Sequence, residues 1–255
     1  MFKRIFFFSI AQIFFLGILS AQTLYMPRDV KQAYQNNTRS LDGKPGKNYW
    51  QNYGRYNISV TAMPPNRDIK GSEQITYINN SPDTLNHLVF KLILNIHKPG
   101  VARAGDASPD YLTDGVHIDN FTLNGTPHKW NEGYGHATWQ GQRLSKPLLP
   151  HDSVQITVDW HYTISLQSGR EGMIDSTTYF LAYFYPRVAV YDDYRGWDQM
   201  TFTDAQEFYN DFNDYTLTVN VPKNYIVWAT GILQNPKDVL QPGYAAKLKA
   251  SMSSD

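Results

Sequence analysis

Residues 154–164 read Val-Gln-Ile-Thr-Val-Asp-Trp-His-Tyr-Thr-Ile, and this stretch decides the fold class. Large apolar residues occupy every second position, and polar residues fill the positions between them. Because successive side chains of a β-strand point to opposite faces, this alternation predicts a strand with one buried face and one solvated face. It places Trp160 in the core and His161 in solvent.

Similar patterns occur on both sides of this stretch. Leu217, Val219 and Val221 alternate with polar residues, and Pro222 ends that run. Asn124-Gly125 is a typical hairpin turn. Helix signals are confined to 28–36. Further strands are expected around Ile58 and Ile75, and over residues 88–94, 116–123 and 225–229, while residues 247–252 read as the start of one more strand. Many short strands separated by turns predict a sandwich or open barrel.

The first 21 residues have the features of a secretory signal peptide. Lys3 and Arg4 precede a 15-residue apolar run from Ile5 to Leu19, and Ser20-Ala21 supplies small residues for cleavage. The run is shorter than the ~20 residues that a membrane-spanning helix needs. We therefore expect an exported protein, periplasmic or extracellular, with no transmembrane segment after the signal is removed.

Composition excludes several classes of function. The 255 residues contain 23 Lys and Arg, 23 Asp and Glu, and no Cys. The balanced charge argues against nucleic acid as a partner, because such proteins carry a basic surface. The absence of Cys excludes a disulfide scaffold and thiolate chemistry.

Two groups of residues invite a metal or acid–base interpretation. His128, Glu132 and His136 are spaced by four, but Gly133 and Gly135 disfavour a helix there, which favours a loop. An acidic stretch is compatible with a polar loop, a calcium site or a glycosidase carboxylate pair. Its members are Asp192, Asp193, Asp198, Asp204, Glu207, Asp211 and Asp214.

A family resemblance appears in the middle of the chain. Residues 179–193 read Tyr-Phe-Leu-Ala-Tyr-Phe-Tyr-Pro-Arg-Val-Ala-Val-Tyr-Asp-Asp, followed by Gly196-Trp-Asp and by Glu-Phe-Tyr-Asn-Asp-Phe at 207–212. With residues 56–60, 69–85, 149–154 and 229–233, this order resembles the amino-terminal domain of zinc aminopeptidases related to aminopeptidase N and leukotriene hydrolase. It is most similar to their exported Bacteroidetes-type branch.

The resemblance implies an all-β fold, a saddle-like β-sandwich of mixed or antiparallel sheets that follows a cleaved signal helix. It divides the chain into a signal peptide (1–21), an N-terminal extension (22–52) and the β domain (53–255), whose C-terminal end we expect to be incomplete. In the family this domain packs on a thermolysin-like catalytic domain and walls one side of the active-site cleft.

The resemblance also suggests two substrate-binding residues. Relatives hold the substrate's free amine with a Gln and a Glu just before a Pro, and the matching positions here are Tyr183 and Tyr185, before Pro186. A phenol can accept a hydrogen bond from an ammonium group but lacks a carboxylate's charge. Arg187 is a candidate structural partner of the acidic stretch.

The family's catalytic motifs, Gly-x-Met-Glu-Asn and His-Glu-x-x-His, do not occur in these 255 residues. We therefore expect zinc in an intact parent protein but none bound by this chain, and no catalytic residue within it. The expected partners are a peptide substrate and a missing catalytic domain. The alternative is a stand-alone secreted module that binds peptide or glycan. An exposed apolar patch and an unfinished edge strand would favour the fragment, whereas a module should bury both.

Overall fold

The computed structural model describes residues 24–133 and 138–253, and the expected signal peptide lies outside them. Within these described residues, the chain divides into two compact units: residues 24–50 with 193–195, and residues 51–192 with 196–253. In the first unit, the expected helix is present as α2 (Arg28–Gln35). Arg39 donates to Asp193 at 2.8 Å, which ties the small segment 193–195 to this unit.

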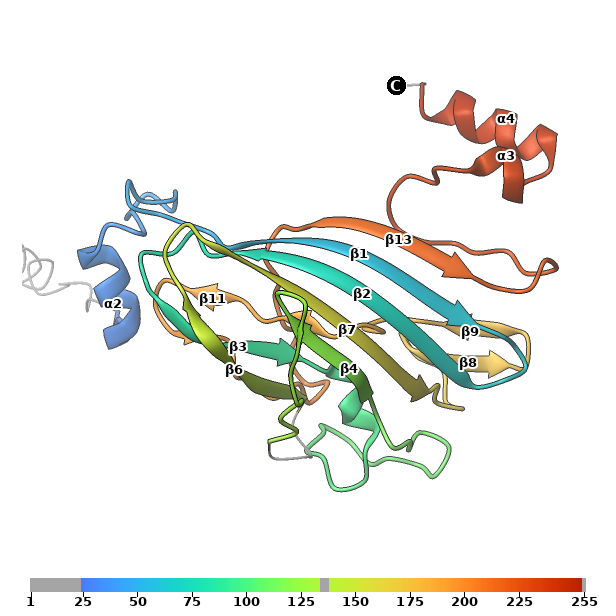
Figure 1. The fold of residues 1–255 in the computed structure, drawn as a ribbon, viewed down its shortest axis with the longest axis horizontal. Coiled ribbons are helices and arrows are strands. Elements are labelled where there is room, and N and C mark those ends of the chain that lie inside the picture. Colours follow the sequence, from blue (N-terminus) through green and yellow to red (C-terminus); the bar gives the residue numbers. More distant parts are fainter. Residues whose placement is uncertain (1–23, 134–137, 254–255) are drawn as a thin grey trace, which may run out of the picture. The chain divides into compact units, whose positions relative to one another are not determined.

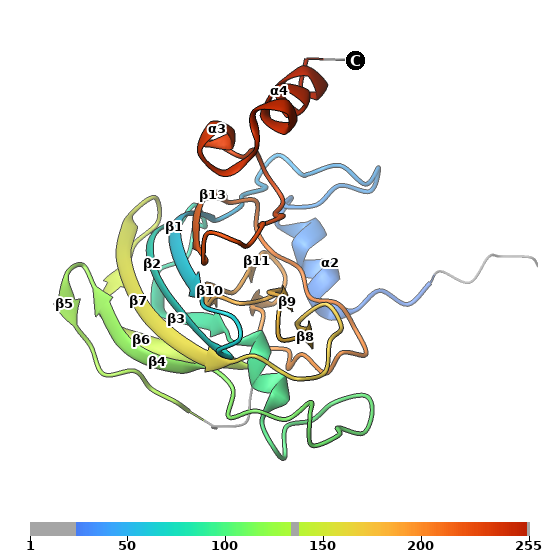
Figure 2. The same cartoon turned by 90° about the vertical axis from the view of Figure 1, so that its right-hand side faces the viewer.

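The second unit is an all-β sandwich of mixed and antiparallel sheets. Its larger sheet has the order β13-β1-β2-β7-β4-β5, and its smaller sheet has the order β10-β3-β6. Figure 1 shows the long strands of the larger sheet side by side, and Figure 2 shows this sheet curving around β3 and β10. The strands are β1 (Tyr53–Ala62), β2 (Asp68–Ile78), β3 (Leu85–Lys91), β4 (His117–Leu123), β5 (Thr126–Pro127), β6 (Trp139–Leu148), β7 (Ser153–Thr163), β10 (Arg187–Val188) and β13 (Asp214–Asn220).

Hairpins and short helical segments complete the described part of this unit. The hairpins are β8 (Gly172–Asp175) with β9 (Thr178–Phe180), and β11 (Tyr191–Asp192) with β12 (Gly196–Trp197). The helical segments are η1 (Ile93–His97), α3 (Pro236–Val239) and α4 (Pro242–Ser251). Within residues 24–133 and 138–253, no helix combines the length and the apolar character needed to cross a membrane.

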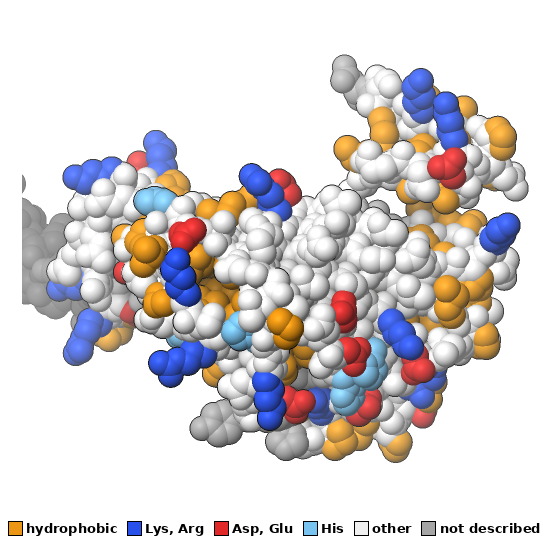
Figure 3. All heavy atoms as spheres, in the orientation of Figure 1, with side chains coloured by type: hydrophobic (Ala, Val, Ile, Leu, Met, Phe, Trp, Pro, Cys, Tyr) orange, Lys and Arg blue, Asp and Glu red, His pale blue; other side chains and the backbone are white. Residues whose placement is uncertain are grey.

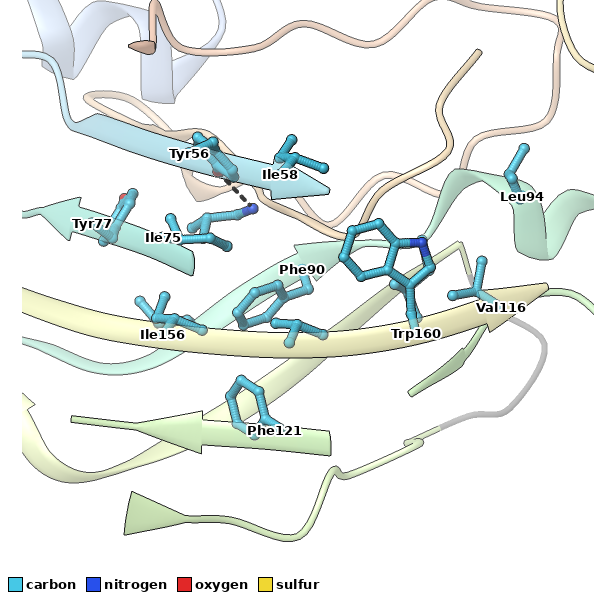
Figure 4. Close-up of a cluster of buried hydrophobic side chains, with 14 of the residues drawn as sticks. Tyr56, Ile58, Ile75, Tyr77, Phe90, Leu94, Val116, Phe121, Ile156 and Trp160 are labelled. Atoms are coloured by element: carbon cyan, nitrogen blue, oxygen red, sulfur yellow. Dashed lines mark hydrogen bonds between the residues drawn. The ribbon is translucent and has the colours of Figure 1, made fainter. Parts of the chain in front are cut away.

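One apolar core lies between the two sheets. Figure 4 shows Phe90 of β3 among side chains of the larger sheet, including Ile75 and Ile156. The outward face of the larger sheet carries mostly uncharged polar side chains, which Figure 3 draws in white. The alternation at 154–164 is confirmed: β7 buries Trp160 and leaves His161 at the surface beside Asp119.

Trp160 is accommodated by a glycine on the neighbouring strand. Gly71 of β2 lies directly across from Trp160 in the antiparallel register. A Cβ atom at Gly71 would lie 2.2 Å from the indole ring, well inside van der Waals contact. The indole Nε1 donates to the carbonyl of Phe184 at 2.8 Å. The core of the larger sheet thus anchors the backbone between Tyr183 and Tyr185.

Three sequence expectations about strands are corrected. The strand expected over 88–94 ends at Lys91, and residues 93–97 form the 3₁₀ helix η1. Residues 225–229 pair with no strand in the described part of the chain, so they are not a strand. Residues 247–252 lie mostly in helix α4 instead of beginning a strand.

The three corrections to the expected strands have different physical reasons. A short apolar run does not distinguish a strand from a buried helical turn, because both bury the same side chains. An extended segment becomes a strand only when a neighbouring backbone supplies hydrogen-bond partners. Helix α4 has Pro242 at its first turn and several Ala, Leu and Lys, all of which favour a helix.

Candidate functional site

Tyr183 and Tyr185 lie in segment 181–186, between β9 and β10, which has no regular secondary structure. Tyr183 has φ +60°, a conformation that large L side chains rarely adopt. The next peptide carbonyl, that of Phe184, accepts the Trp160 hydrogen bond. This anchored, unusual backbone directs the two phenols into different surroundings.

Tyr185 belongs to a cluster of tyrosines at the edge of the larger sheet. Its hydroxyl lies 3.1 Å from that of Tyr215, and its ring makes an edge contact with Tyr56. The Tyr56 and Tyr215 rings are stacked, with centroids 5.0 Å apart. The Tyr56 hydroxyl accepts from the backbone N–H of Val188, the hydrogen bond drawn dashed in Figure 4. Burial raises the pKa of Tyr185, so its phenol stays protonated at neutral pH.

Tyr183 packs against a second aromatic cluster. Its ring contacts Phe202 and Phe208, and its hydroxyl accepts a hydrogen bond from Arg170 at 2.9 Å. Arg170 also forms an exposed ion pair with Glu207. Tyr183 and Tyr185 are close in the sequence, but the structure places their hydroxyl groups with different partners.

Arg187 lies between these two clusters. It is 6% exposed, and its guanidinium stacks on Phe208 with 4.1 Å to the ring centroid. Its Nε and one of its terminal nitrogens are shielded from solvent and have no hydrogen-bond partner. Burial lowers the pKa of Arg187, while nearby tyrosines oppose that shift. An arginine nevertheless remains protonated in proteins.

Arg187 contacts the acidic stretch through the ring of Phe208 and not through an ion pair, and Lys91 makes the ion pair there. Lys91 faces Arg187 across the β3–β10 register and forms a buried ion pair with Asp198 at 2.8 Å. Its ammonium group also donates to the carbonyl of Met200 at 2.9 Å. Burial lowers the pKa of Lys91, and the Asp198 carboxylate opposes that shift.

The other acids of this stretch disperse among separate partners. Asp193 pairs with Arg39, and Glu207 with Arg170. Asp211 is near Gln51, and burial raises its pKa to about 7. Such dispersion favours the polar-loop interpretation over a calcium site or a catalytic carboxylate pair. In residues 24–133 and 138–253, no three His, Cys, Asp or Glu side chains form a group that could hold a metal ion.

The histidine motif at 128–136 lies in a loop as far as the structure describes it. His128 follows β5, and residues up to Gly133 have no helical structure. His136 lies outside the described residues. A buried pair that the sequence did not predict is His97 with Glu171, at 2.8 Å. Only the fold brings these two residues together, because 3₁₀ helix η1 and the start of β8 are distant in the chain.

No protein-family model matches this chain, and no curated protein does. Solved structures are similar to it. A crystal structure of an M1 zinc metallopeptidase from Deinococcus radiodurans is 15% identical, covering 74% of this chain and 36% of that one, with a TM-score of 0.44. A mutant of that peptidase bound to a Tyr-Ser-Ala substrate is 13% identical, covering 75% of this chain and 37% of the other, with a TM-score of 0.42.

This chain therefore spans little more than a third of the length of those structures. Zinc and the peptide substrate belong to the peptidases that were compared.

Proposed function

We propose that this chain is the amino-terminal, cleft-shaping domain of an exported zinc metallo-aminopeptidase, an enzyme that removes amino-terminal residues from peptides. Residues 1–21 would be its signal peptide, 22–52 an extension, and 53–255 the β domain. Tyr183 and Tyr185 are the proposed substrate contacts. The proposal begins from the sequence resemblance around residues 179–212 and gains support from one feature of the fold.

That feature is the uncovered inward face of β13. β13 is the edge strand of the larger sheet, paired in parallel with β1. Tyr215 and Leu217 lie beside Tyr56 and Ile58, on the face that β1 turns to the core. Ile58 is 2% exposed, yet Leu217 is 39% and Tyr215 47% exposed. The apolar face of this sheet therefore continues beyond the part that the smaller sheet covers.

The chain after β13 adds more exposed apolar surface. It turns back from the end of β13 toward α3 (Figure 1). Ile226, Trp228 and Ile232 on this segment are exposed, and Trp228 is 89% exposed. Large exposed apolar patches mark interaction surfaces in proteins. An edge strand with a bare apolar face is the feature expected of a domain that packs on another domain.

The described residues do not fit a zinc site of their own. Zinc in proteins is held by three or four N, S or O ligands in a close group, and no such group occurs in residues 24–133 or 138–253. Zinc ligands and a general base would belong to the catalytic domain.

The alternative is a stand-alone secreted module that binds peptide or glycan. Such a module should cover the inward face of β13, because a bare apolar face promotes aggregation. The exposure of Leu217 and Trp228 favours the domain over the module.

The deciding experiment is to read the coding DNA past the codon for Asp255. An open frame that continues into Gly-x-Met-Glu-Asn and then His-Glu-x-x-His is the expected result. A genuine stop codon directly after Asp255 would overturn the aminopeptidase proposal for this chain. In that case, screening the purified chain for bound peptides and glycans would test the module.

A further inference from the structure

The charged groups around Tyr183 and Tyr185 do not balance. Three cations lie there: Arg170 bonds to the Tyr183 hydroxyl, Arg187 stacks beside Tyr185, and Lys91 lies opposite Arg187. Two acids compensate two of them, because Glu207 pairs with Arg170 and Asp198 pairs with Lys91. Arg187 remains a buried cation with no acid partner among the described residues, and two of its shielded nitrogens lack acceptors.

A buried guanidinium without a counter-charge is costly. Removing an ion from water without replacing its hydrogen bonds is unfavourable, and a partner of opposite charge offsets that cost. Glu73 is the remaining acid near these tyrosines, since its charge would act on both Tyr56 and Tyr185. However, neither carboxyl oxygen of Glu73 has a hydrogen-bond partner, Arg187 included, and burial raises its pKa. Glu73 therefore forms no ion pair with Arg187.

We propose that Arg187, together with the hydroxyl groups of Tyr183 and Tyr185, forms a binding site for a carboxylate group. The guanidinium is a planar fork of donors that matches the two oxygens of a carboxylate. The flanking phenols can each donate one further hydrogen bond. An ammonium group, in contrast, would face Arg170, Lys91 and Arg187, and the acids Glu207 and Asp198 are already paired with two of these cations.

Phe208 controls access to this site. Its ring lies over the Arg187 guanidinium at 4.1 Å, and it belongs to segment 198–213, which has no helix or strand. A carboxylate that enters must displace the Phe208 ring, at least partly. Removing the ring should therefore strengthen carboxylate binding, whereas a merely structural Arg187 would gain nothing from its removal.

The source of the carboxylate rests on the proposed function, but the binding itself does not. One source is a carboxylate of a peptide substrate. The other is an acidic side chain of a docked catalytic domain. The two sources share the same chemistry, and they differ in whether the site is still vacant in a chain that extends past Asp255.

The test is an NMR titration of this chain with sodium acetate at constant ionic strength. The arginine Nε–H signal of Arg187 is assigned by its loss in Arg187→Lys. Methylammonium chloride serves as the cationic probe, and sodium chloride as the reference. We expect a saturable shift of the Arg187 signal with acetate and none with methylammonium. Phe208→Ala should lower the Kd for acetate several-fold.

Two results would overturn the proposal. A saturable response to methylammonium in place of acetate would make the site a cation site. No response to either probe, in the wild-type chain and in Phe208→Ala, would make Arg187 a structural cation only. These measurements use the 255-residue chain, so they stand whether or not the reading frame continues.

The source is then distinguished in the extended protein, if the frame continues. A site that still responds to acetate is open to a substrate. A site that responds in the 255-residue chain but not in the extended one is filled by the docked domain. The existence of the carboxylate site is decided by the first titration, and this second titration decides which carboxylate occupies it.

Discussion

At the scale of single residues, Glu73 places a carboxyl group inside an apolar core. It lies on β2 opposite Ile58 and Val158, and neither of its oxygens has a hydrogen-bond partner. Burial raises its pKa well above the usual value. The folded state thus retains a proton that the unfolded chain releases near pH 4.3.

Because of this proton, the free energy of unfolding falls as the pH rises. Below the unfolded pKa both states are protonated, so Glu73 has no effect. Above it, stability falls by about 1.4 kcal/mol per pH unit until the folded pKa is reached. We expect Glu73→Gln to lack this term, so that its stability relative to wild type rises from pH 5.5 to 6.5. Urea unfolding of both proteins at each pH measures the difference, and a constant difference would contradict the account.

Gly71 gives a second prediction at this scale. A methyl group there would overlap the Trp160 indole at 2.2 Å, so we expect Gly71→Ala to cost about 1–3 kcal/mol. Gly141 on β6 is the matched control, because its Cβ would meet nothing nearer than 4.0 Å. Gly141→Ala should change stability by at most about 0.5 kcal/mol. Thermal unfolding of the two variants compares them, and equal losses would argue against the steric explanation.

At the scale of elements, β13 and β1 differ in how well their inward faces are covered. Ile58 and Leu217 are direct neighbours in the parallel register. They are 2% and 39% exposed, respectively. This pair therefore isolates the effect of burial on two similar side chains.

We expect Ile58→Ala to cost about 2–5 kcal/mol, because it leaves a cavity in a closed core. Leu217→Ala should cost less than about 1.5 kcal/mol in this chain, since water already reaches the side chain. Denaturant unfolding measures both losses. If Leu217→Ala were as damaging as Ile58→Ala, the inward face of β13 would be covered in solution, and the docking proposal would lose its main support.

Some elements could be predicted from the local sequence pattern alone. The alternation of 154–164 and of 217–221 predicted β7 and β13, because period two encodes which side chains share one face of a strand. The Asn124-Gly125 turn was likewise predicted, and both residues have the positive φ that such a turn requires. The prediction for residues 225–229 was wrong, since a strand needs a partner that local sequence cannot supply.

At the scale of the whole molecule, we expect the purified chain, supplied with zinc, to hydrolyse an aminoacyl p-nitroanilide no faster than buffer does. The reason is that activation of water by zinc needs a closed set of ligands and a general base. Activity should be followed across the final purification peak, to separate the chain from contaminating peptidases. Chelator-sensitive hydrolysis that tracks the chain through that peak would contradict this prediction.

One part of the candidate site could be predicted from the sequence, and another part could not. Tyr183 and Tyr185 could be singled out from the sequence, and they remain proposed contacts. The surroundings of Arg187 could not be predicted, because Lys91, which lies opposite Arg187 and takes Asp198 as its ion-pair partner, is far from both in the chain. The choice of Lys91 over Arg187 as the partner of Asp198 depends on the β3–β10 register.

The sequence alone determined the all-β class, the strand faces and the core positions such as Trp160. These properties follow from the period of the chain, since each side chain's direction is set by its immediate neighbours. The tertiary structure decided that β13 is an edge strand with a bare apolar face. It also decided that Arg187 is buried and has no acidic ion-pair partner among the described residues. Exposure and charge balance depend on which distant residues meet, and local sequence does not carry that information.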